Sequence, residues 1–374
     1  MVYLDYSATT PVLPEILDSY IKVTNEYFGN PNSLHGLGTK SQELLKEATK
    51  QICDILNIKE NETIITSGAT ESNNLALIGT AMAYGEKGSR IIVSKLEHDS
   101  IYGICKYLES NGFIIDYVNN DKEGVIDFED LKNLIKPETI LVSINAVNSE
   151  LGIRQPIKTI KQIINKENSK TIFHSDMTQA MGKVPVNLSD VDLASMSSHK
   201  IYGPKGIGLL YKKEGINIKP LFYGSGEDFR PGTPPLPLIV TFSKALRLAS
   251  LDLNKKADKI KKINDKICEH LKKYPNILIN QTKYSIPHIL NISLMDIKSE
   301  TFIHALEKYE IFVGSNTACS GGKISAAVLN LYQDKKRALT TIRISISYLT
   351  KYEEINVFLD NFDLIYNRLK ELSN

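Results

Sequence analysis

The feature that most constrains the fold of this chain is a regular alternation of strand-like and helix-like patterns across residues 63–211. Short apolar runs at 63–66, 191–196 and 208–211 predict buried strands, and an amphipathic pattern such as 100–108 predicts a helix. Strands that alternate with helices favour a mostly parallel sheet whose faces are covered by the helices. The sequence therefore predicts an α/β fold.

A lysine stands between two of these predicted strands. Lys200 follows Ser197, Ser198 and His199, and it precedes a turn rich in glycine and proline. Small hydroxyl residues and a histidine beside a buried strand suit an amine that binds a carbonyl cofactor. The alternative is a solvated surface lysine, which is how most lysines occur.

An acidic residue ends the preceding predicted strand. Residues 171–174 are rich in strand-forming side chains, and Asp176 follows them. Open α/β sheets bind ligands at the carboxyl ends of their parallel strands. A carboxylate there would keep the pyridine nitrogen of pyridoxal phosphate protonated, so that the ring can accept electrons. Alternatively Asp176 caps the next helix, but its spacing from Lys200 favours the cofactor because both residues end neighbouring elements.

A strand-to-helix turn is suited to binding phosphate. Residues 67–72 follow the predicted strand 63–66 and consist of small or polar residues that open a helical pattern. Such residues let backbone amides approach an anion, and the helix dipole attracts it. A capping box that uses Glu71 is the alternative. A second segment, 320–325, resembles a nucleotide-binding P-loop but lacks its first glycine and has Ile324 where magnesium needs a hydroxyl.

The four cysteines fall into two groups. Cys53, Cys105 and Cys268 occur in amphipathic helical patterns, so we expect all three to be small buried hydrophobic residues. Cys319 lies in the polar, glycine-rich stretch 314–322, which we expect to form an exposed and mobile loop. The spacing of the four predicts neither a zinc site nor a disulfide framework.

Composition bounds the class of protein. A length of 374 residues suggests two domains, and 45 Lys+Arg against 43 Asp+Glu give a net charge of +2. This balance implies no strong attraction to nucleic acid or to a membrane surface. We expect no export signal and no membrane span, because no apolar run reaches about 20 residues. Free cysteines then predict a cytoplasmic protein.

Taken together, these motifs resemble those of the cysteine desulfurases, fold-type I pyridoxal phosphate enzymes of the class V aminotransferase group. The resemblance runs nearly end to end and is carried by residues 4–11, 28–31, 67–72, 97–98, 147–150, 176–179, 199–200, 230–233, 318–319 and 341–343. It implies a large cofactor-binding domain, residues 15–250, with a mostly parallel sheet of the seven-stranded type. It also implies a smaller α+β domain, formed by residues 1–14 and 251–374, that carries the mobile cysteine loop at about 314–325.

The resemblance implies a role for each matching residue. Lys200 would form the covalent link to pyridoxal phosphate, Asp176 would pair with the pyridine nitrogen, and His98 would stack on the ring and help to move protons. Before the resemblance is considered, a structural histidine is the better interpretation of His98. The other implied cofactor-binding residues are Gly68, Ala69, Thr70, Asn148, Gln179, Ser197, His199 and, on the cofactor of the other subunit, Thr233. The implied substrate-binding residues are Asn30, Asn148 and Arg343, whose guanidinium fork suits an α-carboxylate. No metal ligand is implied.

The implied reaction converts L-cysteine to L-alanine. The freed amine of Lys200 would remove the Cα proton, and the Cys319 thiolate would attack the substrate sulfur to form a persulfide. A free thiol titrates near pH ~8.5, so Cys319 needs a proton acceptor, for which His98 is a candidate. The resemblance further implies a homodimer and a sulfur-acceptor protein, either an iron–sulfur scaffold or a tRNA-thiolation enzyme.

Some positions depart from the pattern of the relatives. Ser198 and Met177 stand where smaller residues are common, and residues 320–330 are slightly shorter than in the longer-loop desulfurases. That length still fits the longer-loop class better than the short-loop class. Two other functions remain open at this point: a non-catalytic paralogue that serves as a partner-binding subunit, and a selenocysteine lyase or other class V lyase.

Overall fold

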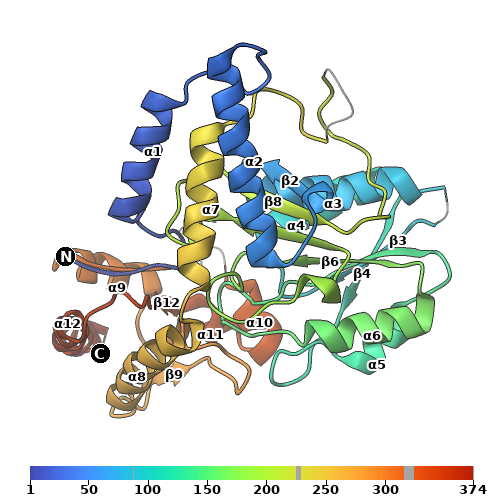
Figure 1. The fold of residues 1–374 in the computed structure, drawn as a ribbon. Coiled ribbons are helices and arrows are strands. Elements are labelled where there is room, and N and C mark those ends of the chain that lie inside the picture. Colours follow the sequence, from blue (N-terminus) through green and yellow to red (C-terminus); the bar gives the residue numbers. More distant parts are fainter. Residues whose placement is uncertain (87, 225–228, 316–323, 374) are drawn as a thin grey trace.

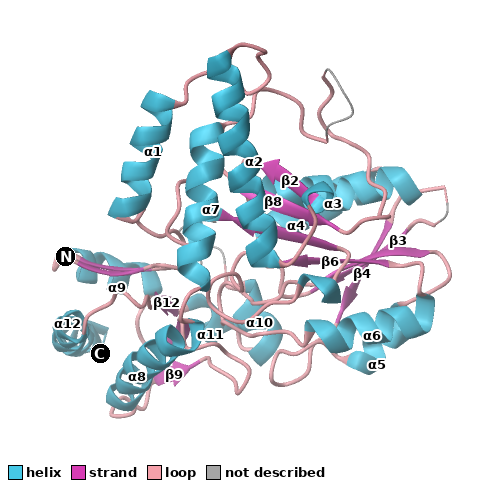
Figure 2. Ribbon diagram, viewed as in Figure 1, coloured by secondary structure: helices cyan, strands magenta, loops and turns pink. Residues whose placement is uncertain are grey.

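The computed structural model describes residues 1–86, 88–224, 229–315 and 324–373 (Figure 1). At its centre lies a seven-stranded sheet (Figure 2) with the spatial order β2 (Thr63–Thr66), β8 (Gly208–Lys212), β7 (Leu193–Ser197), β6 (Ile172–Asp176), β5 (Thr139–Ser143), β3 (Arg90–Ser94) and β4 (Ile114–Val118). Only β8 runs antiparallel to its neighbours, and every other pair is parallel. The predicted α/β fold with a mostly parallel sheet is confirmed.

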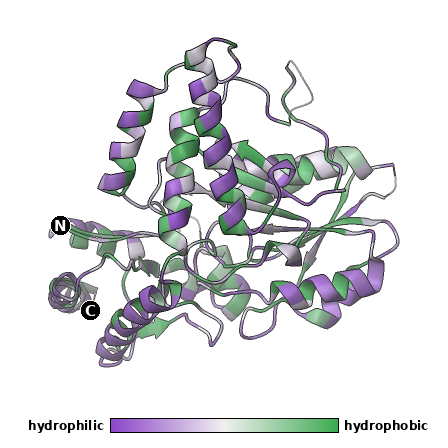
Figure 3. Cartoon of the chain, in the orientation of Figure 1, coloured by the Kyte–Doolittle hydropathy of each residue, from purple (hydrophilic) through white to green (hydrophobic). Residues whose placement is uncertain are grey.

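The central strands are buried along their whole length. All five positions of β5, β6 and β7 are buried, as expected for parallel strands with helices on both faces. One face packs against α1 (Pro14–Glu26), α2 (Gly36–Leu56), α5 (Phe128–Leu134), α6 (Ile157–Asn168) and α7 (Leu236–Ser250), and the other against α3 (Ala69–Tyr84) and α4 (Asp99–Ser110). The covering helices are amphipathic: α6, for example, alternates hydrophilic and hydrophobic residues (Figure 3) and buries Ile160 and Ile164.

A second hydrophobic core lies beside the large sheet. It contains the antiparallel strands β12 (Thr341–Ser345), β10 (Ile289–Leu294) and β9 (Ile277–Ile279), the parallel pair β1 (Val2–Leu4) and β11 (Ile311–Val313), and the helices α8 (Leu253–Leu271), α9 (Ser299–Glu307) and α12 (Tyr352–Ser373). The lysine-rich helix α8 begins at Leu253, shortly after α7 ends. The division into domains at residues 15–250, and 1–14 with 251–374, stays a prediction.

Short elements connect the two cores. Helices α10 (Ala326–Tyr332) and α11 (Lys335–Leu339) share a small apolar cluster with Leu96 and Leu151, which lie in loops of the large sheet. The described residues also form three short 3-10 turns, η1 (Glu60–Glu62), η2 (Leu188–Asp190) and η3 (Ser198–Lys200). The last of these carries the lysine that the sequence singled out.

The cysteines differ from one another more than predicted. Cys53 and Cys105 are buried, but Cys268 is only partly buried. It packs against the second hydrophobic core, and its Sγ donates hydrogen bonds to Asn264 Oδ1 (3.3 Å) and Gln281 Oε1 (3.5 Å), so the expectation of a buried hydrophobic residue is confirmed only in part for Cys268. Cys319 lies outside the described residues. Among the helices that the structure describes, none is both long and apolar enough to cross a membrane.

Candidate active site

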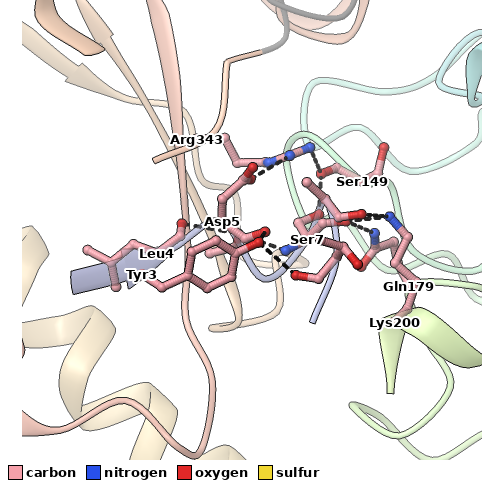
Figure 4. A network of polar contacts seen from close by, with 11 residues as sticks. Tyr3, Leu4, Asp5, Ser7, Ser149, Gln179, Lys200 and Arg343 are labelled. Atoms are coloured by element: carbon pink, nitrogen blue, oxygen red, sulfur yellow. Dashed lines mark hydrogen bonds and ion pairs between the residues drawn. The ribbon is translucent and has the colours of Figure 1, made fainter. Parts of the chain in front are cut away.

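Lys200 is held in place by the N-terminal segment of the chain. It ends η3, the turn that follows β7. Its Nζ donates hydrogen bonds to the carbonyl oxygens of Ser7 and Ala8, both at 2.7 Å (Figure 4). This contact across the chain is not the arrangement of a freely solvated surface lysine. The amine is therefore fixed beside the carboxyl ends of the sheet strands.

Asp176 lies at the same edge of the sheet. It is the last residue of β6, which pairs in parallel with β7, and its side chain is 8% exposed. Asn73 Nδ2 donates to its Oδ2 and the Thr178 amide donates to its Oδ1, both at 2.9 Å. No α-helix begins in the described residues directly after Asp176, so the carboxylate holds a turn and does not cap a helix. Two donors thus orient the carboxylate at the strand end.

Several buried polar atoms around Asp176 have no hydrogen-bond partner in the part of the chain that the structure describes. They include Asn73 Oδ1, Thr178 Oγ1 and Gln179 Oε1. The amide of Gln179 is itself fixed, because its Nε2 donates to Ser7 O at 2.9 Å. Leaving a buried polar atom unpaired costs free energy. The cluster therefore indicates a place for a polar ligand, and the Asp176 carboxylate beside it suits the protonated ring nitrogen of pyridoxal phosphate.

The amino end of α3 offers a place for the phosphate. Gly68 is the N-cap of this helix and provides no side-chain cap. A Cβ on Gly68 would lie 3.6 Å from Ser197 Oγ, so the Ser197 hydroxyl and the helix terminus share one space. Glu71 Oε2 accepts a hydrogen bond from the amide of Ser67, the residue before the N-cap (2.8 Å), so the alternative of a capping box is not formed here. Ala69 is half-buried and Thr70 is exposed at the same turn.

His98 connects to the Asp176 cluster through hydrogen bonds. It is exposed and forms the N-cap of α4, where its Nδ1 accepts from the Ser100 amide at 3.2 Å. Ser100 Oγ lies 3.0 Å from the same Nδ1 and also accepts from Asn73 Nδ2 at 3.1 Å. His98 therefore has the structural role of a cap, and its exposed ring remains available to a ligand. The sequence analysis did not identify Asn73, which donates hydrogen bonds to both Ser100 and Asp176. The signal that could have identified it is a polar residue at a buried position of α3.

Burial shifts the pKa values of two nearby side chains in the direction that favours their neutral forms. Burial and the adjacent Lys200, Lys205 and Lys183 lower the pKa of His199 to about 4. Its Nδ1 lies 3.1 Å from Thr9 Oγ1, which fixes the ring against the N-terminal segment. Burial also raises the pKa of Glu97 well above its usual value. His199 is thus an uncharged imidazole at neutral pH.

Arg343 reaches the site from the second core. Its Nη2 contacts Asp5 Oδ1 at 3.0 Å and its Nη1 donates to Ser149 O at 3.1 Å (Figure 4). Its Nε is buried and has no partner among the described residues. The guanidinium predicted to bind a substrate carboxylate is therefore already paired with a protein carboxylate. The contribution of Asp5 was missed from the sequence, although the N-terminal motif contains it.

Asn148 holds a loop. Its Nδ2 donates to Leu96 O at 2.9 Å, and its Oδ1 accepts from the amides of Glu150 (2.9 Å) and Leu151 (2.7 Å). These bonds shape the turn that presents Ser149 O to Arg343. A direct contact of Asn148 with cofactor or substrate stays a prediction.

Two predicted residues lie apart from this cluster. Asn30 is exposed in the turn between α1 and α2, at the opposite end of α1 from β12 (Figure 1), and its Oδ1 accepts from the Asn32 amide. Thr233 is exposed shortly before α7. No contact with Lys200 or Asp176 joins either residue within the described chain, so their roles stay predictions.

Cys319 lies outside the described residues, but the chain on both sides of it is anchored. Gly314 and Arg343 exchange two backbone hydrogen bonds, of 2.8 and 2.9 Å. On the other side, Ser325 Oγ donates to Glu150 Oε2 at 2.6 Å and also caps α10. Both anchors belong to the surroundings of Arg343 and the 148–151 turn.

Comparison with known proteins agrees with this geometry. The aminotransferase class-V family matches residues 2–358. The "NifS/IcsS protein homolog" of Lactobacillus delbrueckii subsp. bulgaricus is 40% identical, covering 100% of this chain and 99% of that protein, and the "Cysteine desulfurase IscS" of Dictyoglomus turgidum is 34% identical, covering 100% and 96%. A solved NifS-like protein superposes with a TM-score of 0.93 at 33% identity, covering 98% of this chain and 99% of the other. The chain therefore belongs to the aminotransferase class-V family and, within it, to the cysteine desulfurase group.

Proposed function

We propose that this protein is a pyridoxal phosphate-dependent cysteine desulfurase that converts L-cysteine to L-alanine and leaves the sulfur as a persulfide on Cys319. The observation that carries the proposal is the placement of the Lys200 amine and the Asp176 carboxylate at the carboxyl ends of adjacent strands β7 and β6. The relative from Dictyoglomus turgidum, which this chain matches end to end, is named a cysteine desulfurase.

The cofactor is supported by the buried Asp176 carboxylate and by the unpaired buried oxygen atoms around it. When bound, pyridoxal phosphate supplies a protonated ring that accepts electrons from the substrate carbon. Asp176 would hold the ring nitrogen, Gln179 the ring oxygen, and His98 one face of the ring. The phosphate would be held by Gly68, Ala69, Thr70, Ser197 and the neutral His199, with Thr233 reaching the cofactor of a second subunit.

Lys200 and Arg343 would have different roles toward the substrate. The Lys200 amine, which the Ser7 and Ala8 carbonyls hold in place, would take the Cα proton. The Arg343 guanidinium would bind the α-carboxylate, and its buried, unpaired Nε supports this role. Because Asp5 occupies Nη2, the substrate carboxylate must share or replace that contact.

The sulfur would pass to Cys319. The carbon–sulfur bond of the substrate breaks as a sulfur–sulfur bond forms to the Cys319 thiolate, and the substrate carbon gains a proton and leaves as alanine. Burial raises the pKa of Cys53 to about 11, of Cys105 to about 12 and of Cys268 to about 11. These three thiols stay protonated near neutral pH and are poor nucleophiles.

The remaining parts of the proposal concern assembly. In the turn between α1 and α2, Phe28 and Leu34 expose 72% and 101% of their surface, and apolar residues exposed together favour a protein contact. We propose that a second copy of the chain covers them. We further propose that the persulfide acceptor is a protein, either an iron–sulfur scaffold or a tRNA-thiolation enzyme. The free thiols favour a cytoplasmic site of action.

Alanine release from L-cysteine tests the proposal. We expect cofactor-loaded wild-type protein to form alanine, Cys319→Ser to keep the cofactor colour but lose turnover, and the matched control Cys268→Ser to retain it. Turnover by Cys319→Ser at the wild-type rate would remove Cys319 from the mechanism. A coloured wild-type protein without turnover would instead support the non-catalytic alternative.

A further inference from the structure

A cavity of about 540 Å³ lies beside the candidate active site, where the two cores meet. Its apolar floor is formed by Ala146, Met177 and Ala180. None of the described residues assigned above to cofactor or substrate lines it. Met177, however, directly follows Asp176 in the chain, so the cavity lies behind the strand end that carries the cofactor-binding carboxylate.

The walls of this cavity are fixed by contacts between the large sheet and the second core. The Arg154 amide donates to Tyr284 O at 2.9 Å, and both residues line the cavity. Next to them, Ser285 Oγ donates to Leu151 O at 2.8 Å and the Ile286 amide donates to Gly152 O at 2.9 Å. The cavity is therefore preformed at a junction between cores, which is a common location of small-molecule sites.

The charges at the rim favour an anion. Arg154, Lys158 and Lys283 line the cavity together with a single carboxylate, Asp190. Arg154 Nη2 donates to Pro185 O at 2.9 Å, which holds the guanidinium at the rim. A guanidinium binds carboxylate or phosphate through its planar fork.

The first turn of α6 adds to this positive potential. The N-cap, Pro156, provides no side-chain cap, and the first turn contains no acidic residue. Pro156, Ile157, Lys158 and Thr159 all line the cavity. The positive end of the helix dipole therefore adds to the charge of Lys158 and Arg154.

We propose that this cavity binds a small organic anion with an apolar body. The apolar part would lie against Met177 and Ala180, and the anionic group would face Arg154, Lys158 and the first turn of α6. The volume of about 540 Å³ falls within the roughly 300–1,000 Å³ of sites for such molecules. Neither an inorganic anion nor a neutral apolar molecule uses both parts of the lining.

Methyl NMR of methionine-labelled holoenzyme tests this proposal with octanoate, 1-octanol and inorganic phosphate as probes. Met177 is buried in the cavity floor, whereas Met82 is exposed on α3 and serves as the internal control. We expect octanoate to shift the Met177 signal saturably without shifting Met82, and to bind at least tenfold more tightly than either other probe. Absence of a saturable Met177 shift, or equal binding of octanol, overturns the proposal.

Two charge reversals on α6 separate binding from folding. Lys158→Glu places an acid in the first turn, which favours the helix but repels an anion, so we expect octanoate to bind at least tenfold more weakly. Lys166→Glu makes the same charge change at the far end of α6 and should leave the affinity unchanged. A filling variant, Val186→Trp, should abolish the Met177 shift. Unchanged octanoate affinity in Lys158→Glu and Val186→Trp contradicts the site even if alanine formation from cysteine is intact.

Discussion

The cofactor side and the carboxylate side of the candidate active site are built in different ways. On the cofactor side, Asp176, Lys200 and Gly68 all lie at ends of elements in one sheet and its first covering helix. On the carboxylate side, Arg343 comes from β12 and meets Asp5 and Ser149, which belong to distant parts of the chain. The first side follows from local topology, and the second depends on long-range contacts.

The two sides also differ in whether their polar groups already have a hydrogen-bond or ion-pair partner in the protein. Around Asp176 several buried acceptor atoms are unpaired in the described chain, so a ligand adds contacts there without removing any. At Arg343 the guanidinium already contacts Asp5, so a substrate carboxylate must compete with a protein carboxylate. We therefore expect substitutions on the cofactor side to affect the rate, and those on the carboxylate side to affect the substrate affinity.

The largest effect is expected for Lys200→Ala. Removal of the amine eliminates both the link to the cofactor and the base for the Cα proton, so kcat for alanine formation should fall by at least about 10³-fold. Lys205→Ala, an exposed lysine of the same segment, is the matched control and should retain activity. Alanine formation by Lys200→Ala above a tenth of the wild-type rate would contradict the assignment.

Asp176→Asn should reduce kcat by about 10²-fold, because a preorganised charge is lost while the shape is kept. The carboxamide oxygen can still accept the hydrogen bond from the Thr178 amide, so the folded state should persist. Steady-state kinetics with a thermal unfolding control measure both properties. A higher KM with an unchanged kcat would show that Asp176 contributes to substrate affinity and not to the rate.

Arg343→Lys should raise KM for cysteine by about 10- to 100-fold and change kcat less. A lysine ammonium keeps the charge but cannot form the two parallel hydrogen bonds of a guanidinium. Kinetics with cysteine and with cysteine methyl ester provide the measurement, because the ester lacks the charge that Arg343 recognises. An equal loss for both substrates would argue against carboxylate binding.

Asp5→Asn should have the opposite and smaller effect. Removal of the competing carboxylate should lower KM by about 2- to 5-fold, in line with a partly exposed ion pair. The measurement is the same kinetic assay at low ionic strength. A rise in KM would show that Asp5 mainly orients Arg343.

The last prediction concerns the stability of the fold, not the kinetics, as a function of pH on the cofactor side. Burial lowers the pKa of His174 from 6.5 to about 4, and its ring lies between Ser143 Oγ (2.9 Å) and Ser195 Oγ (3.0 Å). Between these pH values the unfolded chain binds more protons than the native state, so the free energy of unfolding should fall as pH decreases from 6.5 to 4.

Urea unfolding between pH 7.5 and 5 measures this dependence. Between these pH values, we expect His174→Gln to reduce the loss of unfolding free energy by on the order of 1–3 kcal/mol. The exposed His304→Gln is the matched control for the substitution itself. An identical pH dependence in His174→Gln and wild type would exclude His174 as its source.

The sequence was most informative where function depends on local order. The alternation of strands and helices predicted the sheet, and strand ends identified Asp176 and Lys200, because a strand and the turn after it are adjacent in sequence. The contacts of Ser7 with Lys200 and of Asp5 with Arg343 join residues far apart in sequence, and no local pattern predicts them. The contact of Cys268 with Gln281 arises in the same way, from a residue beyond its own helix.

The most direct test of the central claim is mass spectrometry of the holoenzyme after one equivalent of L-cysteine. We predict one equivalent of alanine, together with the added mass of one sulfur atom on the peptide that contains Cys319. Sulfur on Cys53, Cys105 or Cys268, or alanine formed with no sulfur added to Cys319, would contradict the account.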